Sequence, residues 1–447
     1  WNFINCFNCF FPSSGIFTVN SSLEYQEILG FGGAITDSVG VLLKTLPEEA
    51  QDQIISQYFS ETGLNYAFIR IPIAGCDYST RLYTYDDNGV GQSLENFQLA
   101  PEDYDLKIPY IKRAQSMTSK PIKIVAAPWM APERMTECRY PLLCIDLFRK
   151  LKSEYYGTYA EYMIRFLDAY KEEGLDIWGL STQNEPEDGL IGILAPVNLG
   201  WTPWEQGEWI SQHLGPQLNA SKHRDVKIII YDDQRPLITI WTAIVMSYAE
   251  EYISGIGVHS YLDIFPGALV SLAHKQFPDL FILSTEFSIT RLITFLGPTV
   301  RLGGWDNLEH YVADILENLN HDVNGWIDWN ILLNEEGGPT AYETSGIDSP
   351  IIVNDTGREY YKQPMWYGLA HISRFVPPGS RRVDLKGPMF TYNVFTSAFV
   401  TPQKRLVLIM LNRRSSSFEA NINVGSGNYI NLKMSPNSVH TIICNRF

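Results

Sequence analysis

Positive charge is scarce in this sequence. Its 447 residues contain 34 lysines and arginines against 50 aspartates and glutamates, which gives a net charge of −16, and the basic residues form no run. A chain with this balance has no general electrostatic means of attracting a nucleic-acid backbone. We therefore expect no nucleic-acid partner.

Long hydrophobic runs are missing as well. The longest uncharged apolar stretch, LITIWTAIVMSYA (237–249), is shorter than the roughly 20 residues that cross a bilayer as a helix. We predict no transmembrane segment. The sequence starts at Trp1 without a recognisable signal peptide, and we expect a processed chain.

The chain has only six cysteines, too few for a scaffold held together by disulfides. Cys6 and Cys9 form a CxxC motif, but no second cysteine or histidine pair completes a zinc site. We expect neither a metal nor another cofactor. Cys76 follows an apolar run and is expected to be a buried free thiol. Cys138 and Cys144 flank a short segment and are a candidate disulfide.

Eight short apolar runs recur along the first three quarters of the chain. They are nearly continuous rather than alternating, which is typical of strands covered on both faces. Helix-like segments separate them, and eight such alternations predict an α/β fold, a (β/α)8 TIM barrel. The runs are 28–36, 67–75, 123–131, 177–185, 226–234, 255–263, 280–288 and 325–333. A doubly wound sheet is the alternative, but GFGGAITDS has Ile35 where the phosphate loop G-x-G-x-x-G requires glycine.

The C-terminal part has a different pattern. From about Arg382 onward, apolar and polar residues alternate in short runs such as FTYNVFTSAFVT and KRLVLIMLN, with turn residues between them. This pattern predicts an antiparallel β-sandwich.

Two glutamates stand at the carboxyl ends of predicted barrel strands, where the active site of such a barrel lies. IWGLSTQNEPEDG (177–189) places Glu185 at the end of the fourth strand, and Glu286 ends the seventh. Two carboxyl groups facing each other are what glycoside cleavage requires, about 5–5.5 Å apart where configuration is retained. Pro186 is expected to hold Glu185 in an extended conformation. For one such glutamate alone, a strand that simply reaches the surface would be the better explanation.

Arg70, inside the second strand, needs carboxylate partners if it is buried. It is either a structural ion pair or the cation that stabilises Glu286; no comparable cation is evident for Glu185. Trp129 and Trp329, after the third and eighth strands, are either core residues or platforms for the face of a sugar.

Other strand ends carry His259 and the pair Asp232-Asp233. His259 is also explained as a hydrogen-bonded core histidine. The two aspartates lack the further oxygen ligands of a divalent metal site. We expect them to anchor loops or to pair with Arg235.

Several motifs together resemble the glucosylceramidases of glycoside hydrolase family 30, from about Gly30 to the C terminus. They include GFGGAITDS, IRIPIAGCDYS, TQNEPEDG, VHSYLD, VRLGGWD and GWIDWNILLNEEGGP. The resemblance implies a barrel over residues 30–376 and a sandwich over 377–447, joined by an N-terminal strand from 1–29. It also implies a retaining exo-β-glucosidase that hydrolyses glucosylceramide to glucose and ceramide.

The resemblance further implies a role for each candidate residue. Glu185 would be the general acid/base and Glu286 the nucleophile. The substrate-binding residues would be Asp77, Trp129, Asn184 and Trp329, and the residues that orient the nucleophile would be Arg70, His259 and Tyr261. One departure is Ser260, where the family has a tryptophan; we expect this position near the entrance for the leaving group.

The family works in the acidic lysosomal lumen on a glycolipid at a membrane surface, aided by a saposin-type activator and anionic phospholipid. A secreted protein is the alternative. Three sequons, at Asn20, Asn219 and Asn354, offer sites for N-glycans. Family 30 also contains enzymes for soluble or polysaccharide substrates, β-xylosidases and β-1,6-glucanases. A non-catalytic, lectin-like barrel is disfavoured because both carboxylates are present.

The spacing of Cys138 and Cys144, in a chain expected in an oxidising lumen, predicts a disulfide between them. Mass spectrometry of peptides from the unreduced protein should find the two cysteines linked. Recovery of both as free thiols would exclude the bridge.

Overall fold

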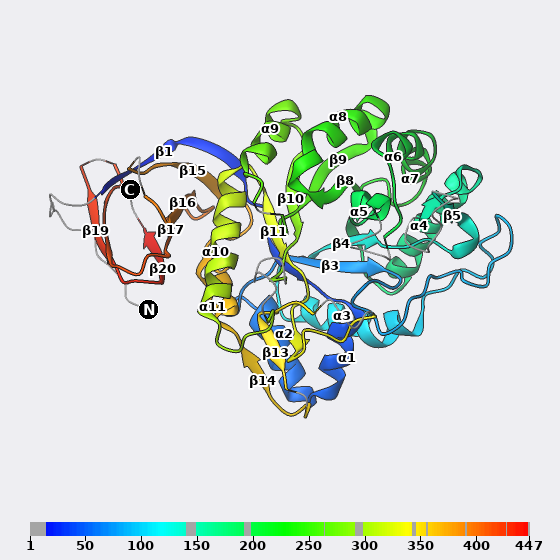
Figure 1. Cartoon of the computed structure of the whole chain (residues 1–447), viewed down its shortest axis with the longest axis horizontal. Coiled ribbons are helices and arrows are strands. Elements are labelled where there is room, and N and C mark those ends of the chain that lie inside the picture. Colours follow the sequence, from blue (N-terminus) through cyan, green and yellow to red (C-terminus); the bar gives the residue numbers. More distant parts are fainter. Residues whose placement is uncertain are drawn as a thin grey trace.

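The computed structural model describes residues 15–139, 149–191, 198–262, 264–290, 298–341, 346–354, 356–388, 391–425 and 427–445. Two units lie side by side in it (Figure 1): a barrel of strands ringed by helices, and a β-sheet unit that contains the C-terminal strands. Cys144 falls outside the described residues, so the disulfide remains a prediction.

Eight parallel strands close the barrel, in the order β10-β11-β2-β3-β4-β7-β8-β9. Each comes from one of the eight predicted apolar runs, so the barrel prediction is confirmed. The strands are β2 (Gly30–Ala34), β3 (Phe68–Ile73), β4 (Lys123–Pro128), β7 (Ile177–Ser181), β8 (Lys227–Gln234), β9 (Ile253–His259), β10 (Phe281–Glu286) and β11 (Gly325–Asp328).

The glycines of β2 serve close packing. A Cβ atom on Gly32 would lie 2.4 Å from the carbonyl oxygen of Phe68 on β3, and one on Gly33 would lie 2.4 Å from Ile331. The glycine-rich run thus lets β2 approach its neighbours more closely than a side chain would allow.

Helices on the outside of the barrel complete the alternation, and several short segments fill its loops. The helices are α1 (Asp37–Thr45), α2 (Glu48–Phe59), α3 (Ile108–Ser116), α4 (Tyr156–Glu172), α5 (Pro186–Ile191), α6 (Pro203–Trp209), α7 (Gly215–Ala220), α8 (Ile238–Ala249), α9 (Ala268–Gln276), α10 (Trp305–Asn320) and α11 (Pro364–Ile372). The short strands are β5 (Thr136–Cys138), β6 (Arg149–Leu151), β12 (Leu333–Asn334), β13 (Ile351–Val353) and β14 (Tyr360–Lys362). No helix among the described residues has the length and apolarity that a membrane crossing requires.

The second unit contains a seven-stranded sheet in the order β19-β18-β1-β15-β16-β17-β20. Its strands are β1 (Gly15–Glu27), β15 (Arg381–Lys386), β16 (Val394–Val400), β17 (Leu406–Asn412), β18 (Phe418–Asn423), β19 (Tyr429–Met434) and β20 (Ser438–Cys444). Adjacent strands are antiparallel except β1 and β18, which are parallel. The predicted C-terminal sandwich of antiparallel strands is confirmed.

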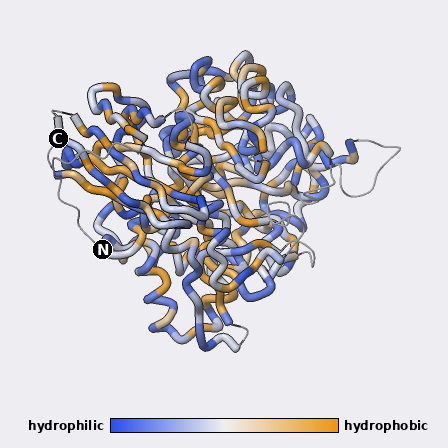
Figure 2. Tube along the Cα trace, turned by 60° about the vertical axis from the view of Figure 1, so that its left-hand side comes forward, coloured by the Kyte–Doolittle hydropathy of each residue, from blue (hydrophilic) through white to orange (hydrophobic). Residues whose placement is uncertain are grey.

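The two units pack against each other through α10 and α11. Residues of β16 and β17 belong to the same hydrophobic core as the barrel, among them Phe399, Val407 and Ile409. Arg413 also forms an ion pair with Glu309 of α10, at 3.3 Å. Figure 2 shows hydrophobic segments running along the strands of both units.

A buried lysine anchors the loop that follows β3. The Lys107 amine lies 2.8 Å from an Asp103 oxygen and 3.6 Å from an Asp37 oxygen, and all three side chains are essentially inaccessible to water. The same amine donates to the carbonyl oxygen of Ala74 at 3.2 Å. Asp77 comes three residues after Ala74. The buried charge cluster therefore holds the backbone close to this candidate substrate-binding residue.

Lys107→Met should lower the free energy of unfolding by about 3–5 kcal/mol, because it leaves two buried carboxylates without their cation. Denaturant titration measures the change. The control is Lys44→Met, since Lys44 pairs with Asp105 at 3.3 Å but both side chains are more than half exposed. It should cost less than about 1 kcal/mol. Equal losses in the two variants would contradict the role of Lys107.

Candidate active site

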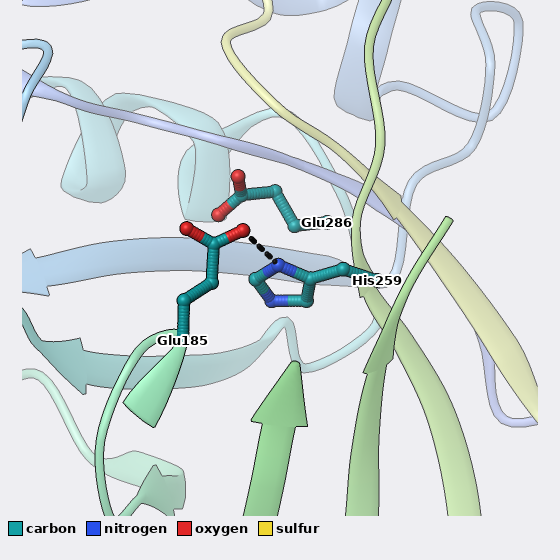
Figure 3. A group of neighbouring side chains, drawn as sticks. All are labelled: Glu185, His259 and Glu286. Carbon is teal, nitrogen blue, oxygen red and sulfur yellow. Dashed lines mark hydrogen bonds and ion pairs between the residues drawn. The ribbon is translucent and has the colours of Figure 1, made fainter. Parts of the chain in front are cut away.

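Glu185 and Glu286 meet at the carboxyl ends of the barrel strands. Glu286 is the last residue of β10, and Glu185 lies in the loop between β7 and α5. One carboxylate oxygen of each, together with a ring nitrogen of His259, all lie within 4.8 Å of one another (Figure 3). The two glutamates predicted to act together are therefore side by side.

The backbone at Glu185 differs from the prediction. Its φ is +42°, in the left-handed region, so the extended conformation expected before Pro186 is wrong. The amide of Glu185 donates to the carbonyl oxygen of Asp232 at 3.0 Å, which holds this conformation. Pro186 opens α5, where its missing N–H costs nothing.

Two donors hold the carboxylate of Glu286. Arg70 donates to Oε2 in a short ion pair, and the Tyr261 hydroxyl donates to Oε1 at 2.8 Å. Arg70 is fully buried and also donates to Asn184 at 2.7 Å and to Asp232 at 3.1 Å. The structure thus brings Arg70 and Tyr261 onto Glu286, as the resemblance implied, and places Asn184 on the same guanidinium.

His259 contacts the other glutamate. Its Nδ1 lies 3.0 Å from Glu185 Oε1, and its Nε2 lies 3.2 Å from Asp232 Oδ1. We expected a hydrogen bond to Glu286 instead. Burial alone lowers the pKa of His259, but the charge of Glu286 and the hydrogen bonds to Asp232 and Glu185 outweigh burial and raise this pKa to about 10. His259 is therefore an imidazolium, and Glu185 does have a cationic neighbour, contrary to the expectation from the sequence.

Two further side chains bind Glu185. Gln234 donates to Oε1 at 3.1 Å, and Asn198 donates to Oε2 at 3.2 Å. Sequence reasoning missed both. Gln234 ends β8 beside the two aspartates and could have been found as a strand-end residue; Asn198 lies in a loop and carried no signal.

Asp232 was interpreted as a loop anchor or a partner of Arg235, and that interpretation is wrong. Burial raises its pKa, but the charge of Arg70 and hydrogen bonds from His259 and Ser181 outweigh burial, so its pKa is lowered. Arg235 forms an ion pair with Asp314 of α10 instead, at 3.2 Å.

Burial raises the pKa of Glu286, and the nearby charge of Glu185 acts in the same direction, while His259 and Arg70 oppose them. Burial, followed by the charges of Glu286 and Glu185, raises the pKa of Asp77 to about 8. Asp77 therefore carries a proton at acidic pH. Its Oδ1 is buried, and no described residue offers it a hydrogen bond.

The two candidate tryptophans stack on each other. The ring centroids of Trp129 and Trp329 lie 5.3 Å apart with an interplanar angle of 16°. The guanidinium of Arg70 lies 5.0 Å from the first ring and 5.3 Å from the second. The aromatic pair thus forms an apolar wall beside the charged centre.

Glu185, His259 and Glu286 are close enough together to be considered as metal ligands. A metal ligand must offer a lone pair, and a histidine does so only as neutral imidazole. As an imidazolium, His259 engages both ring nitrogens as donors. The group therefore suits acid–base chemistry better than metal binding.

Ser260 is fully buried and accepts a hydrogen bond from Asn318 of α10 at 3.1 Å. The expectation that this position lies near the entrance for the leaving group is wrong. The side chain packs between β9 and α10, away from the carboxylate pair.

Comparison with known proteins places this geometry in a family. The glycosyl hydrolase family 30 TIM-barrel domain matches residues 28–376, and the family 30 beta sandwich domain matches 379–442. The mouse lysosomal acid glucosylceramidase is 38% identical over 440 residues, which cover 96% of this chain and 84% of the mouse protein. Putative glucosylceramidase 4 of Caenorhabditis elegans is 37% identical over 432 residues, 95% of this chain and 82% of its own length.

Two solved structures have the same architecture. The crystal structure of SrfJ from Salmonella typhimurium has a TM-score of 0.87 and 24% identity, with 99% of this chain and 95% of SrfJ covered. The endo-β1,6-glucanase BT3312 has a TM-score of 0.82 and 25% identity, with 95% and 93% covered. With its barrel, its sandwich and both family domains matched, the chain belongs to glycoside hydrolase family 30 and is a glycoside hydrolase.

Proposed function

We propose that this protein is a retaining exo-β-glucosidase that hydrolyses glucosylceramide to glucose and ceramide. The observation that carries the proposal is the short separation of the Glu185 and Glu286 carboxylates, since retaining glycosidases need a nucleophile within reach of the same anomeric carbon that the acid serves. Similarity to proteins named glucosylceramidase supports the substrate.

In the first step, a Glu286 oxygen attacks the anomeric carbon while Glu185 gives its proton to the departing glycosidic oxygen. The carbon–oxygen bond to the aglycone breaks and a glycosyl ester forms on Glu286. In the second step, Glu185 takes a proton from water. The water oxygen attacks the anomeric carbon and displaces Glu286, which inverts that carbon a second time. The two inversions retain the β configuration.

The remaining residues bind and orient. Arg70 and Tyr261 aim the Glu286 carboxylate by holding one oxygen each. Asn184 lies beside the nucleophile, where its amide reaches the sugar 2-hydroxyl. Asp77, with an unpartnered buried oxygen, takes a hydroxyl on the far side of the ring. Trp129 and Trp329 bound the ring with apolar surface.

The proposed setting is the lysosomal lumen, with secretion as the alternative. There the enzyme would act on glycolipid at a membrane surface with help from a saposin-type activator and anionic phospholipid. The named compartment of the mouse relative supports this setting.

A second candidate is hydrolysis of soluble or polysaccharide β-glycosides. Endo-1,6-beta-D-glucanase neg1 of Aspergillus fumigatus is 24% identical over 428 residues. The proteins named glucosylceramidase are 37–38% identical, so they support the first candidate more strongly than neg1 supports the second. A comparison of glucosyl and xylosyl chromogenic substrates, then of glucosylceramide and β-1,6-glucan, separates the candidates.

Glu286→Gln should lose turnover by several orders of magnitude, because an amide does not form the glycosyl ester. A 2-deoxy-2-fluoroglucoside with a good leaving group should label the wild type on Glu286 and leave the variant unlabelled. The control is Glu161→Gln, on the exposed face of α4, which should label normally. Wild-type label on another residue would refute the assignment.

Activity should be bell-shaped in pH, with an optimum below neutrality. Glu286 must be ionised to attack, so the rate rises as pH increases through its pKa. Since burial raises that pKa, the acid limb should lie above the roughly 4.3 of an ordinary glutamate. The alkaline limb marks loss of the proton that the leaving group needs, and both apparent values belong to the coupled pair of carboxyl groups.

Glu185→Gln tests the alkaline limb. With a dinitrophenyl glucoside, whose leaving group departs without protonation, the variant's kcat/KM should lose the alkaline limb and keep the acid limb. An unaltered alkaline limb on this substrate would show that Glu185 is not the acid.

A further inference from the structure

The amino end of the barrel carries a cavity, on the opposite side from Glu185 and Glu286. Its volume is about 510 Å³, and its wall includes Lys227, Ile253 and Phe281, which begin β8, β9 and β10. Parallel strands begin at one edge of a barrel and end at the other, and the active site of such a barrel lies at the carboxyl ends. This cavity therefore takes no part in the cleavage proposed above.

Aromatic rings form part of the cavity wall. Beside them, five buried residues from five barrel strands pack together, as inward-facing side chains do: Phe68, Val125, Ile229, Leu283 and Ile327. Trp178 of β7 and Phe281 are only partly buried against this layer, and their ring centroids lie 5.3 Å apart. Both rings line the cavity, so they keep surface that a ligand can cover.

A lysine amine lies against the same aromatic wall. Lys123, the first residue of β4, is half-buried, and its Nζ is 5.5 Å from the centroid of the Trp178 ring. The amine donates to the carbonyl oxygen of Leu29, another wall residue, at 3.3 Å. Burial lowers the pKa of Lys123, and the charge of Glu27 opposes that shift. Glu27 is itself paired with Arg381, at 3.4 Å.

Lys227 adds a second cation, an exposed side chain on the wall itself. Among the residues that the structure describes, neither Lys123 nor Lys227 forms an ion pair with a carboxylate. The acidic wall residues, Glu250 and Asp279, are exposed, so water and salt screen their charges. The amine held against the rings is screened less, and an anion beside it would stabilise its charged form.

We propose that this cavity binds a small aromatic anion, with its rings against Trp178 and Phe281 and its negative group toward Lys123. Lys227 supplies a second, more exposed contact for the same negative group. A mostly apolar cavity with a few charged groups is the usual form of a small-molecule site, and aromatic side chains pack well against the edges and faces of aromatic ligands. The inference is independent of the proposed glucosidase activity, because the cavity lies at the other end of the barrel.

Two fluorescent probes with the same rings test the proposal: the anion anilinonaphthalene sulfonate, and the neutral phenylnaphthylamine, which lacks the sulfonate. Fluorescence titration gives a dissociation constant for each. Wild type should bind both saturably, and the sulfonate more tightly. Lys123→Met should weaken binding of the sulfonate by roughly fivefold to tenfold, because a charge-assisted contact is lost, and should not weaken binding of the neutral probe. Lys227→Met should act in the same direction by roughly threefold, since its side chain is exposed.

Trp178→Leu should weaken binding of both probes, because both lose contact with the ring; the lysine variants decide the matter if this one folds poorly. The matched control is Lys433→Met, an exposed lysine on β19 of the other unit, which should change neither constant. Sulfonate binding that is unaltered in both cavity lysine variants overturns the proposal. So does equal weakening of the two probes in those variants, since the lysines would then not act through their charge. Absence of saturable sulfonate binding to wild type overturns it as well.

Discussion

The buried guanidinium of Arg70 is the interaction on which the arrangement of this site depends. It lies inside the barrel on β3 and donates to side chains from three other places: Glu286 on β10, Asn184 after β7 and Asp232 on β8. A buried charge is tolerated only where partners surround it, and loss of a partner leaves it uncompensated. The same constraint holds Glu286, the proposed nucleophile, because its movement would take from Arg70 one of two carboxylate partners. Packing against Trp129 and Trp329 removes water from the pair and strengthens it.

Charge balance around Arg70 constrains the other carboxyl groups of the site. Arg70 and His259 supply two positive charges, and Asp232 and Glu286 supply two negative charges. A further carboxylate in the same buried space would leave an excess of negative charge. Asp77 avoids that excess, because its raised pKa of about 8 keeps it protonated at acidic pH. In the proposed mechanism, formation of the ester on Glu286 removes one negative charge, and the carboxylate that Glu185 becomes on giving up its proton restores the balance.

Sequence patterns were sufficient to predict the barrel, since eight continuous apolar runs correspond to eight buried parallel strands. They also predicted that Glu185 and Glu286 lie close together, since the carboxyl ends of the strands meet at one edge of the barrel. They were insufficient for the contacts of His259 and Asp232, because a strand register does not say which neighbour a side chain turns toward. Asn198 was out of reach for another reason: a loop residue becomes visible only once the loops that surround it are placed. Ser260 shows the same limit, because the comparison with the family pattern suggested the entrance, while the structure turns its side chain toward α10.

Irregular backbone places Glu185, the proposed acid/base, where regular strands would not. Tyr231 and Asp232 both have positive φ, at 70° and 56°, and the pairing of β8 with β9 shifts register at this point. Such a bulge re-aims side chains next to an active site, and here it turns Asp232 toward Arg70 and His259. The backbone of Glu185 also lies in the left-handed region, and its amide donates to the carbonyl oxygen of Asp232. Each of these conformations costs of order 1–3 kcal/mol and persists only where the surroundings enforce it. Because Arg70 binds Asp232 directly, the residue that holds Glu286, the proposed nucleophile, also stabilises the strained backbone at Glu185, the proposed acid/base.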